Sequence, residues 1–251
     1  MFETIKSRFY QGQQFIKDIK NAPMREQFRG FPILDNANCN NCSKCLSVCP
    51  TNALKLNPIT IDMGKCTFCG ACKNICKTNA IDFSNFYKLA STDREKLLIT
   101  EDINNNDFSN TAIIVKKEIK RIFSKSLKLR QVSAGGCNGC ELELNACSNV
   151  NFDMGRFGID FVASPRHADG IVITGPITEN MAYALEDCYK SIPDPKIVIL
   201  CGACAISGGV FQGSENLNRE FLEKYPIDLY IPGCPVHPLT FINAVLSFVG
   251  R

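Results

Sequence analysis

The chain has 251 residues, 45% of them apolar, with a formal net charge of +3 and 15 cysteines. This length fits one large or two modest domains with a buried core, and the absence of a long apolar run argues against a membrane-spanning helix. The first twenty residues also lack the continuous apolar stretch of a signal peptide. We therefore expect a reducing, cytoplasmic environment, in which the cysteines serve metal rather than disulfides.

The charge is divided unevenly along the chain. Residues 1–128 carry 20 Lys and Arg against 12 Asp and Glu, a balance of +8, whereas residues 129–251 carry 8 against 13, a balance of −5. Such asymmetry is typical of a protein that docks against something. The basic half has no interleaved aromatic patch and no nucleic-acid motif, so we expect no nucleic-acid partner.

Residues 1–30 predict an amphipathic helix. Its apolar side chains fall roughly on one face, and its basic side chains lie elsewhere. The apolar positions are Phe2, Ile5, Phe9, Ile16 and Ile19. We expect this helix to pack against this protein or a neighbour; contact with a lipid surface is the alternative.

Residues 31–88 contain one cysteine pattern written twice. The cysteines are Cys39, Cys42, Cys45 and Cys49 in the first copy, and Cys66, Cys69, Cys72 and Cys76 in the second, 27 positions later. The spacing C-x2-C-x2-C-x3-C is that of a two-cluster bacterial ferredoxin, in which the fourth cysteine of each run ligates the other cluster. The predicted ligand sets are therefore Cys39, Cys42, Cys45 with Cys76, and Cys66, Cys69, Cys72 with Cys49. A structural zinc site does not need eight thiolates at this spacing.

Residues 89–128 are interpreted as a connector. The polar run 101–107 predicts a loop, and residues 112–128 predict a basic helix. That helix is expected to meet an acidic partner or the acidic half of this chain; a solvated basic face is the alternative.

Residues 129–251 alternate short apolar runs with helical patterns, which predicts an α/β domain with a doubly wound parallel sheet. The expected strands are 129–133, 159–163, 171–174, 196–200 and 228–231. The expected helices are 141–147, 179–190, 215–224 and 239–248. Sheets of this class bind ligands at the carboxyl ends of their strands.

Three loops that follow expected strands carry cysteines among glycine and proline. These cysteines, Cys137, Cys140, Cys204 and Cys234, predict a third four-cysteine site. Cys201 competes with Cys204, but its place at a strand end favours a buried structural thiol. Cys147 and Cys188 fall on expected helices and are interpreted as packing residues. Twelve ligands would then hold three [4Fe–4S] clusters.

The motifs of the C-terminal half occur in the order of a known family. They are Gly136-Cys137-Asn138-Gly139-Cys140-Glu141, Ser164-Pro165-Arg166-His167-Ala168-Asp169, Thr174-Gly175-Pro176, Gly202-Ala203-Cys204-Ala205 and Pro232-Gly233-Cys234-Pro235. Together they resemble the small subunit of group 4 membrane-bound [NiFe] hydrogenases, of the formate hydrogenlyase and energy-converting types. These are relatives of the 20-kDa-class subunit of complex I. Residues 1–88 resemble the separate polyferredoxin subunit, so the chain resembles a fusion of the two.

The resemblance implies a flavodoxin-like domain whose Cys137, Cys140, Cys204 and Cys234 hold the proximal cluster beside a nickel- and iron-bearing large subunit. It also implies other subunits of a membrane-bound complex, a ferredoxin or formate dehydrogenase-type donor, and a peripheral place on the cytoplasmic side of the membrane. The alternative is the same relay in a complex I-like quinone-reducing or sulfur-reducing oxidoreductase. Complex I relatives have two adjacent cysteines where this chain has Cys137 and Cys140, which favours the hydrogenase.

The chain departs from the family pattern at two places. Lys77 stands where proline often follows the eighth ferredoxin cysteine, and Val236-His237 stands where a second proline is common. Neither removes a ligand.

The polar residues other than cysteine are weaker candidates for a functional role. Glu141 and Glu143 could relay protons, but acidic residues are also expected at a helix N-terminus. Arg166 and His167 could contact the large subunit or a cluster sulfide, or lie in surface pairs. No nucleophile motif, phosphate loop or dinucleotide fingerprint is present, so we expect no complete active site on this chain alone.

Overall fold

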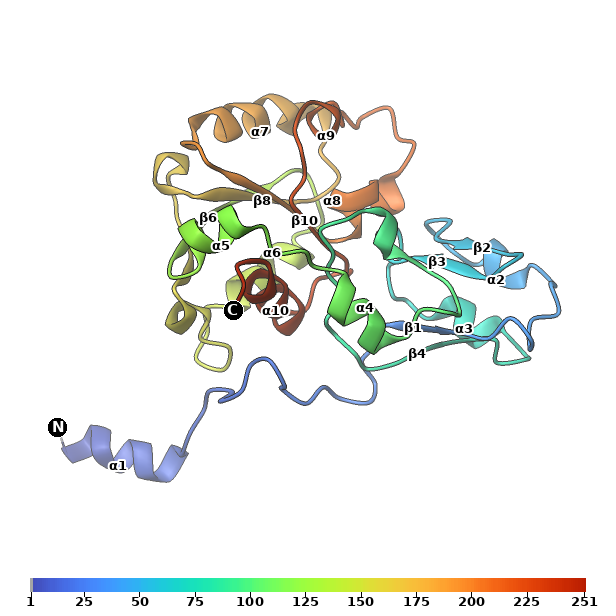
Figure 1. The fold of residues 1–251 in the computed structure, drawn as a ribbon, viewed down its shortest axis with the longest axis horizontal. Helices are drawn as coiled ribbons and strands as arrows, with labels where there is room; N and C mark the ends of the chain where they lie inside the picture. The colour runs from blue at the N-terminus through green and yellow to red at the C-terminus, as the bar shows by residue number, and fades with distance from the viewer. Residues whose placement is uncertain (1) are drawn as a thin grey trace.

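A five-stranded parallel sheet organises the C-terminal half in the computed structural model, which describes residues 2–251 (Figure 1). Its strands are β6 (Leu127–Ser133), β7 (Ile159–Phe161), β8 (Gly170–Thr174), β9 (Ile197–Cys201) and β10 (Leu229–Ile231). They lie side by side in the order β10-β9-β8-β6-β7. Counted from β6, this is the flavodoxin-like order 2-1-3-4-5. The predicted fold class is confirmed.

Helices cover both faces of this sheet. On one face lie α6 (Gly139–Ala146) and α10 (Pro238–Phe248); on the other lie α7 (Glu179–Ser191), α8 (Ala203–Ser207) and α9 (Phe221–Lys224). Strand β8 explains the arrangement, because Ile171 and Ile173 pack with Leu185 of α7 whereas Val172 packs with the α10 side. A strand covered on both faces is almost entirely apolar, as β8 is, with the sequence Gly-Ile-Val-Ile-Thr.

The ferredoxin lobe, residues 31–99, lies beside the carboxyl ends of this sheet. Its strand β1 (Pro32–Leu34) pairs antiparallel with β4 (Ile81–Phe83). A second sheet joins β2 (Leu54–Lys55), β3 (Thr60–Asp62) and β5 (Leu98–Ile99), the last of which follows the 3-10 turn η1 (Glu95–Leu97). The short helices α2 (Lys44–Ser47) and α3 (Ala71–Ile75) each carry the third cysteine of one copy of the repeat.

The connector contains one helix more than predicted. Helix α4 (Asn105–Thr111) occupies part of the run expected as a loop, because the Asn104 side chain accepts hydrogen bonds from the backbone N–H groups of Asn106 and Asp107. The basic helix is α5 (Lys117–Phe123), shorter than predicted. Lys116, which precedes it, lies 3.6 Å from Asp228, so this segment meets the acidic half of its own chain.

The helix predicted over 215–224 was wrong for its first half. Only α9 is helical there, because residues 216–218 bond instead to the loop before α7. Glu179 donates its N–H to the carbonyl of Asn216, and Asn218 donates to that of Ile177. Short 3-10 turns complete the fold; they are η2 (Met154–Phe157), η3 (Pro165–His167) and η4 (Gly209–Phe211).

The N-terminal helix also ends earlier than predicted. Helix α1 (Phe2–Gln11) has no buried residue and stands away from the body of the molecule (Figure 1). The predicted packing of this helix on its own chain is therefore not found. Residues 13–28 instead form an extended strap across the C-terminal domain, where Ile19 is buried and its carbonyl accepts a hydrogen bond from Asn243 of α10 at 2.9 Å.

None of the helices found among residues 2–251 combines the length and the apolar character needed to cross a bilayer. The predicted division of the chain into residues 1–30, 31–88, 89–128 and 129–251 stays a prediction. Two elements differ from it, because β5 of the predicted connector joins the ferredoxin sheet and β6 begins at Leu127, before the last boundary.

Candidate iron–sulfur sites

The first predicted ligand set surrounds one cavity of the ferredoxin lobe. Its four members, Cys39, Cys42, Cys45 and Cys76, all line this space, whose other walls include Leu56, Ile59 and Ile81. Cys76 comes from the end of α3 in the second copy of the repeat. The backbone between the first cysteines turns sharply, with Asn41 at φ 54° and Ser43 at φ 58°. This turn lets three closely spaced thiols face one space.

The second predicted set surrounds a neighbouring cavity. Cys49, Cys66, Cys69 and Cys72 line it, with apolar walls from Leu54, Ile61 and Phe83. Burial raises the pKa of the Cys66 thiol to about 12 and that of Cys72 to about 11. Thiols in such surroundings ionise readily only when a cation compensates the charge, as the irons of a cluster do.

Backbone amides point at sulfur in this second cavity. The N–H of Phe68 donates to the Sγ of Cys66 at 3.3 Å, and the N–H of Ala53 donates to the Sγ of Cys49 at 3.3 Å. Hydrogen bonds to thiolate sulfur are one means by which proteins tune iron–sulfur clusters. The donor set and its surroundings therefore fit a [4Fe–4S] cluster in each cavity.

The third set meets at the carboxyl ends of the parallel strands. Cys137 and Cys140 follow β6, Cys204 lies in α8 after β9, and Cys234 follows β10. Burial raises the pKa of Cys204 to about 11, and the neighbouring sulfurs of Cys234, Cys140 and Cys137 act in the same direction. The four predicted ligands are thus close enough to influence one another.

Glycines allow the backbone to approach this third set. A Cβ on Gly202 would lie only 2.7 Å from the Sγ of Cys140, and its φ of +96° is in the region that favours glycine. The sequence Cys201-Gly202-Ala203-Cys204 therefore needs glycine at this position. Among residues 2–251, no group of three or more His, Cys, Asp or Glu side chains is arranged to hold a single metal ion.

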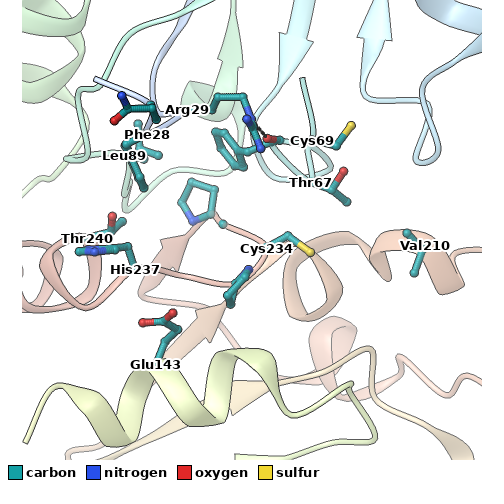
Figure 2. A pocket seen from close by; sticks show the side chains of 15 residues that line it. Phe28, Arg29, Thr67, Cys69, Leu89, Glu143, Val210, Cys234, His237 and Thr240 are labelled. Carbon is teal, nitrogen blue, oxygen red and sulfur yellow. Dashed lines mark hydrogen bonds between the residues drawn. The ribbon is translucent and has the colours of Figure 1, made fainter. Parts of the chain in front are cut away.

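A cavity of about 580 Å³ joins the second and third sets. Figure 2 shows Cys69 on the wall made by the ferredoxin lobe and Cys234 on the wall made by the C-terminal domain. The two sets also interact electrostatically. The pKa of Cys234 is raised mainly by burial, then by Cys140 and Cys137, and to a smaller extent by the Cys69 sulfur. Arg29 anchors the upper wall by donating to the carbonyl of Phe68 at 2.6 Å.

Comparison with known proteins identifies both halves. Residues 137–248 match the family of the NADH ubiquinone oxidoreductase 20 kDa subunit, and residues 38–80 match the 4Fe–4S dicluster domain. The chain is 37% identical over 129 residues to the probable membrane-bound hydrogenase subunit mbhJ of Pyrococcus furiosus, covering 51% of this chain and 77% of that protein. The chain belongs to the 20 kDa subunit family.

Other similar proteins are named as subunits of two kinds of complex. Formate hydrogenlyase subunit 7 of Escherichia coli is 40% identical over 136 residues, 54% of this chain and 53% of that protein. An NADH-quinone oxidoreductase subunit of Citrifermentans bemidjiense is 42% identical over 112 residues, 45% of this chain and 65% of that protein. The resemblance drawn from the cysteine motifs is confirmed, and the chain is an iron–sulfur electron-transfer subunit of the oxidoreductase type.

The remaining cysteines of this 20 kDa-family domain are placed differently. Cys201 is fully buried at the end of β9, and its neighbouring thiol is the main cause of the lowered pKa of Cys140. Cys147 is buried and donates to the carbonyl of Glu143 at 3.4 Å. Cys188 is half-buried on α7.

The polar candidate residues named from the sequence also lie in different places. Glu141 is buried and accepts hydrogen bonds from Ser133 Oγ at 2.7 Å and Thr174 Oγ1 at 2.6 Å, which ties α6 to β6 and β8. Glu143 lines the cavity between the second and third sets, and burial raises its pKa. Arg166 and His167 precede β8, so they lie at the opposite end of that strand from the third set.

Two residues for which the sequence predicted no role contribute to this region. His237 accepts a hydrogen bond from the Leu239 N–H through Nδ1 at 3.1 Å and so caps α10. The following Pro238 is a recognisable signal of a helix start. Arg219 donates to carbonyls around Cys204, and no local pattern marks it, because its partners lie 13–43 residues away.

Proposed function

We propose that this chain relays electrons through three [4Fe–4S] clusters to a partner subunit that carries the catalytic metal. Cys39, Cys42, Cys45 and Cys76 would hold the distal cluster, and Cys49, Cys66, Cys69 and Cys72 the middle one. Cys137, Cys140, Cys204 and Cys234 would hold the proximal cluster. When bound, each cluster supplies a one-electron couple whose potential responds to burial and hydrogen bonds.

The observation that carries this proposal is the shared cavity of Cys69 and Cys234. Two four-cysteine sets that each present one cysteine to the same cavity give adjacent redox sites, with no separate carrier between them. This also gives the order of the three clusters, because the set that contains Cys69 is the one that faces the C-terminal domain. The role of this chain is to keep the sites at fixed separation and to tune them.

The exposed surroundings of the third set support a partner subunit. Cys137 and Cys234 are exposed, and Cys234 lines the cavity shared with the ferredoxin lobe. Leu142, two positions after Cys140, is 61% exposed, and Val210, which lines the same cavity as Cys234, is 56% exposed. Apolar surface gathered around exposed ligands is typical of a face that another subunit covers. A stand-alone carrier would not need it.

We propose that the partner is the nickel- and iron-bearing large subunit of a hydrogenase, in a complex attached peripherally to the cytoplasmic face of a membrane. The Cys137–Cys140 spacing favours this partner, and so does the similarity to the mbhJ and formate hydrogenlyase proteins. A ferredoxin or a formate dehydrogenase-type protein would exchange electrons at the distal end. The similarity to the NADH-quinone oxidoreductase protein favours a second candidate, the same relay with a quinone-reducing partner.

Metal analysis tests the cluster count. Anaerobically purified protein should contain about twelve irons and twelve sulfides per chain, as expected for three cubanes. Cys234→Ser should lose about a third of the iron, from the C-terminal site alone. Cys188→Ser is the matched control, since Cys188 is a half-buried cysteine outside all three sets. Equal iron contents in Cys234→Ser and Cys188→Ser would refute the third ligand set.

The native assembly tests the partner. Purified under anaerobic conditions, it should contain nickel and reduce a viologen dye with hydrogen. Cys234→Ser should abolish hydrogen-dependent reduction through the ferredoxin lobe while nickel stays in the assembly. An assembly without nickel that reduces quinone would support the second candidate.

A further inference from the structure

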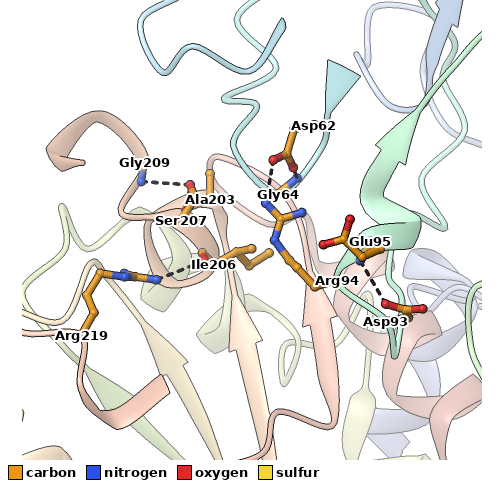
Figure 3. Close-up of polar contacts among 10 residues, drawn as sticks. All are labelled: Asp62, Gly64, Asp93, Arg94, Glu95, Ala203, Ile206, Ser207, Gly209 and Arg219. Atoms are coloured by element: carbon orange, nitrogen blue, oxygen red, sulfur yellow. Dashed lines mark hydrogen bonds and ion pairs between the residues drawn. The ribbon is translucent and has the colours of Figure 1, made fainter. Parts of the chain in front are cut away.

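A half-buried arginine holds the short helix that carries Cys204. Arg219 donates through Nη1 to the carbonyls of Pro176 at 2.9 Å and Cys204 at 3.3 Å. Through Nη2 it donates to the carbonyls of Ala205 at 2.8 Å and Ile206 at 3.0 Å. Figure 3 shows its side chain reaching toward α8. One guanidinium thus ties the backbone of a predicted ligand to the loop that precedes α7.

The charge of Arg219 is not matched by a carboxylate. All four acceptors are neutral carbonyls, and the ion pairs found within residues 2–251 do not include it. Burial lowers the pKa of Arg219, and the opposing effect comes from negative charge on Cys204. Arginine stays protonated in such surroundings. Because Arg219 donates to the carbonyl of Cys204, its positive charge lies beside the backbone of this predicted ligand.

A second arginine on the other side of α8 provides a contrast. Arg94 donates to Asp62 at 2.6 Å and forms an ion pair with it. Ile206 of α8 and Arg94 both lie against Gly64, where a Cβ would be 2.8 Å from Ile206 Cγ2 and 2.9 Å from Arg94 Cζ. Figure 3 places both arginines around the same helix. The charge of Arg94 is neutralised by Asp62, whereas the charge of Arg219, next to Cys204, is not neutralised by a carboxylate.

We propose that Arg219 is a positioning residue for Cys204 and that its unmatched charge raises the reduction potential of the C-terminal cluster. Reduction adds one electron and no proton to a cluster, so a fixed cation nearby stabilises the reduced form over the oxidised one. A higher reduction potential at the C-terminal cluster would favour electron transfer to it from the clusters of the ferredoxin lobe. This inference rests on the cluster of the proposed function.

A redox titration followed by electron paramagnetic resonance tests the inference in the full-length, anaerobically purified protein. The C-terminal cluster is recognised as the signal that Cys234→Ser lacks. Arg219→Gln keeps amide donors and removes the charge, and Arg219→Lys keeps the charge and loses the forked donors. Arg121→Gln is the matched control, since Arg121 lies exposed on α5.

In Arg219→Gln, the equilibrium between the reduced and oxidised C-terminal cluster should shift about tenfold toward the oxidised form. For a one-electron couple that is a fall in midpoint potential of about 59 mV. Arg219→Lys should stay close to the wild-type midpoint, and the ferredoxin signals should not move in any variant. Arg121→Gln should match the wild type at all sites.

An unchanged midpoint in Arg219→Gln with full iron content overturns the inference. If Arg219→Gln fails to retain the cluster, retention in Arg219→Lys supports the role of the charge, and equal loss in both variants overturns it. A wild-type protein without the third signal would refute the proposed function instead, so the two failures are distinguishable.

Discussion

The ferredoxin lobe and the C-terminal domain differ in what fills their interiors. In the lobe, strands are two or three residues long and eight cysteines surround two cavities. In the C-terminal domain, all five residues of β8 and of β9 are buried, and nearly every residue of α10 is buried as well. The domain has an apolar core of its own, whereas the lobe has a core with two cavities lined by thiols. We infer that the lobe depends on its clusters for stability and that the domain does not.

Removal of iron gives the largest expected effect on this contrast. An anaerobic chelator should unfold the lobe, because small cysteine-rich modules gain much of their folding free energy from the metal. Hydrogen–deuterium exchange should show loss of protection over residues 31–99 and retained protection over β6, β8 and β9. Equal loss across both regions would mean that the domain depends on clusters as well.

A cavity in the apolar core should destabilise the domain without affecting the lobe. Phe241 of α10 is fully buried, so Phe241→Ala should lower the free energy of unfolding of the domain by about 3–5 kcal/mol. Chemical denaturation followed by circular dichroism measures this loss. Phe9→Ala is the control, since Phe9 is 84% exposed, and a change of under about 0.5 kcal/mol is expected there. Altered ferredoxin signals in folded Phe241→Ala would argue against independent interiors.

The Arg94–Asp62 ion pair, which lies within the lobe near Ile206 of the C-terminal domain, should have an intermediate effect. Arg94→Met leaves Asp62, whose side chain is 12% exposed, with only the Gly64 N–H as a donor at 2.9 Å. We expect a loss of about 1–3 kcal/mol for a largely buried charge that loses its partner. Lys6→Met breaks the exposed pair with Glu3 and should cost almost nothing. Thermal unfolding of both variants compares the two, and equal melting temperatures would contradict a structural role for Arg94.

The smallest expected effect is a pH dependence at the start of α10. Burial lowers the pKa of His237, so its neutral form is favoured in the folded state and its contribution to stability is complete above the unfolded value of about 6.5. That contribution, about 1 kcal/mol for a cap, is lost as the pH falls below 6.5 and through the lower folded value, because protonated Nδ1 no longer accepts the Leu239 N–H. Unfolding measured from pH 7.5 to about 5 should show it. His237→Asn keeps a capping oxygen and should remove this dependence; an identical slope in both proteins would contradict it.

Local signals identified much of the fold and of the candidate sites. The spacing of Cys39, Cys42 and Cys45 constrains one loop, and alternating apolar runs predicted the sheet, because both depend on residues close in the chain. The short polar helix α4 was missed because its capping residue, Asn104, lies inside a run that is typical of loops. The first half of the helix predicted over 215–224 was wrong because the distant segment around the start of α7 competes for its backbone hydrogen bonds.

By itself, the order of residues determined the cysteine repeats, the crossed pairing expected of them and the alternation of strand with helix. Only the tertiary structure decided that the strap carrying Ile19 crosses α10, that Arg219 reaches the carbonyls around Cys204, and that Cys69 faces Cys234. The physical reason is sequence separation. Each of these contacts joins groups that no local periodicity relates, so it exists only after the sheet and the lobe have packed together.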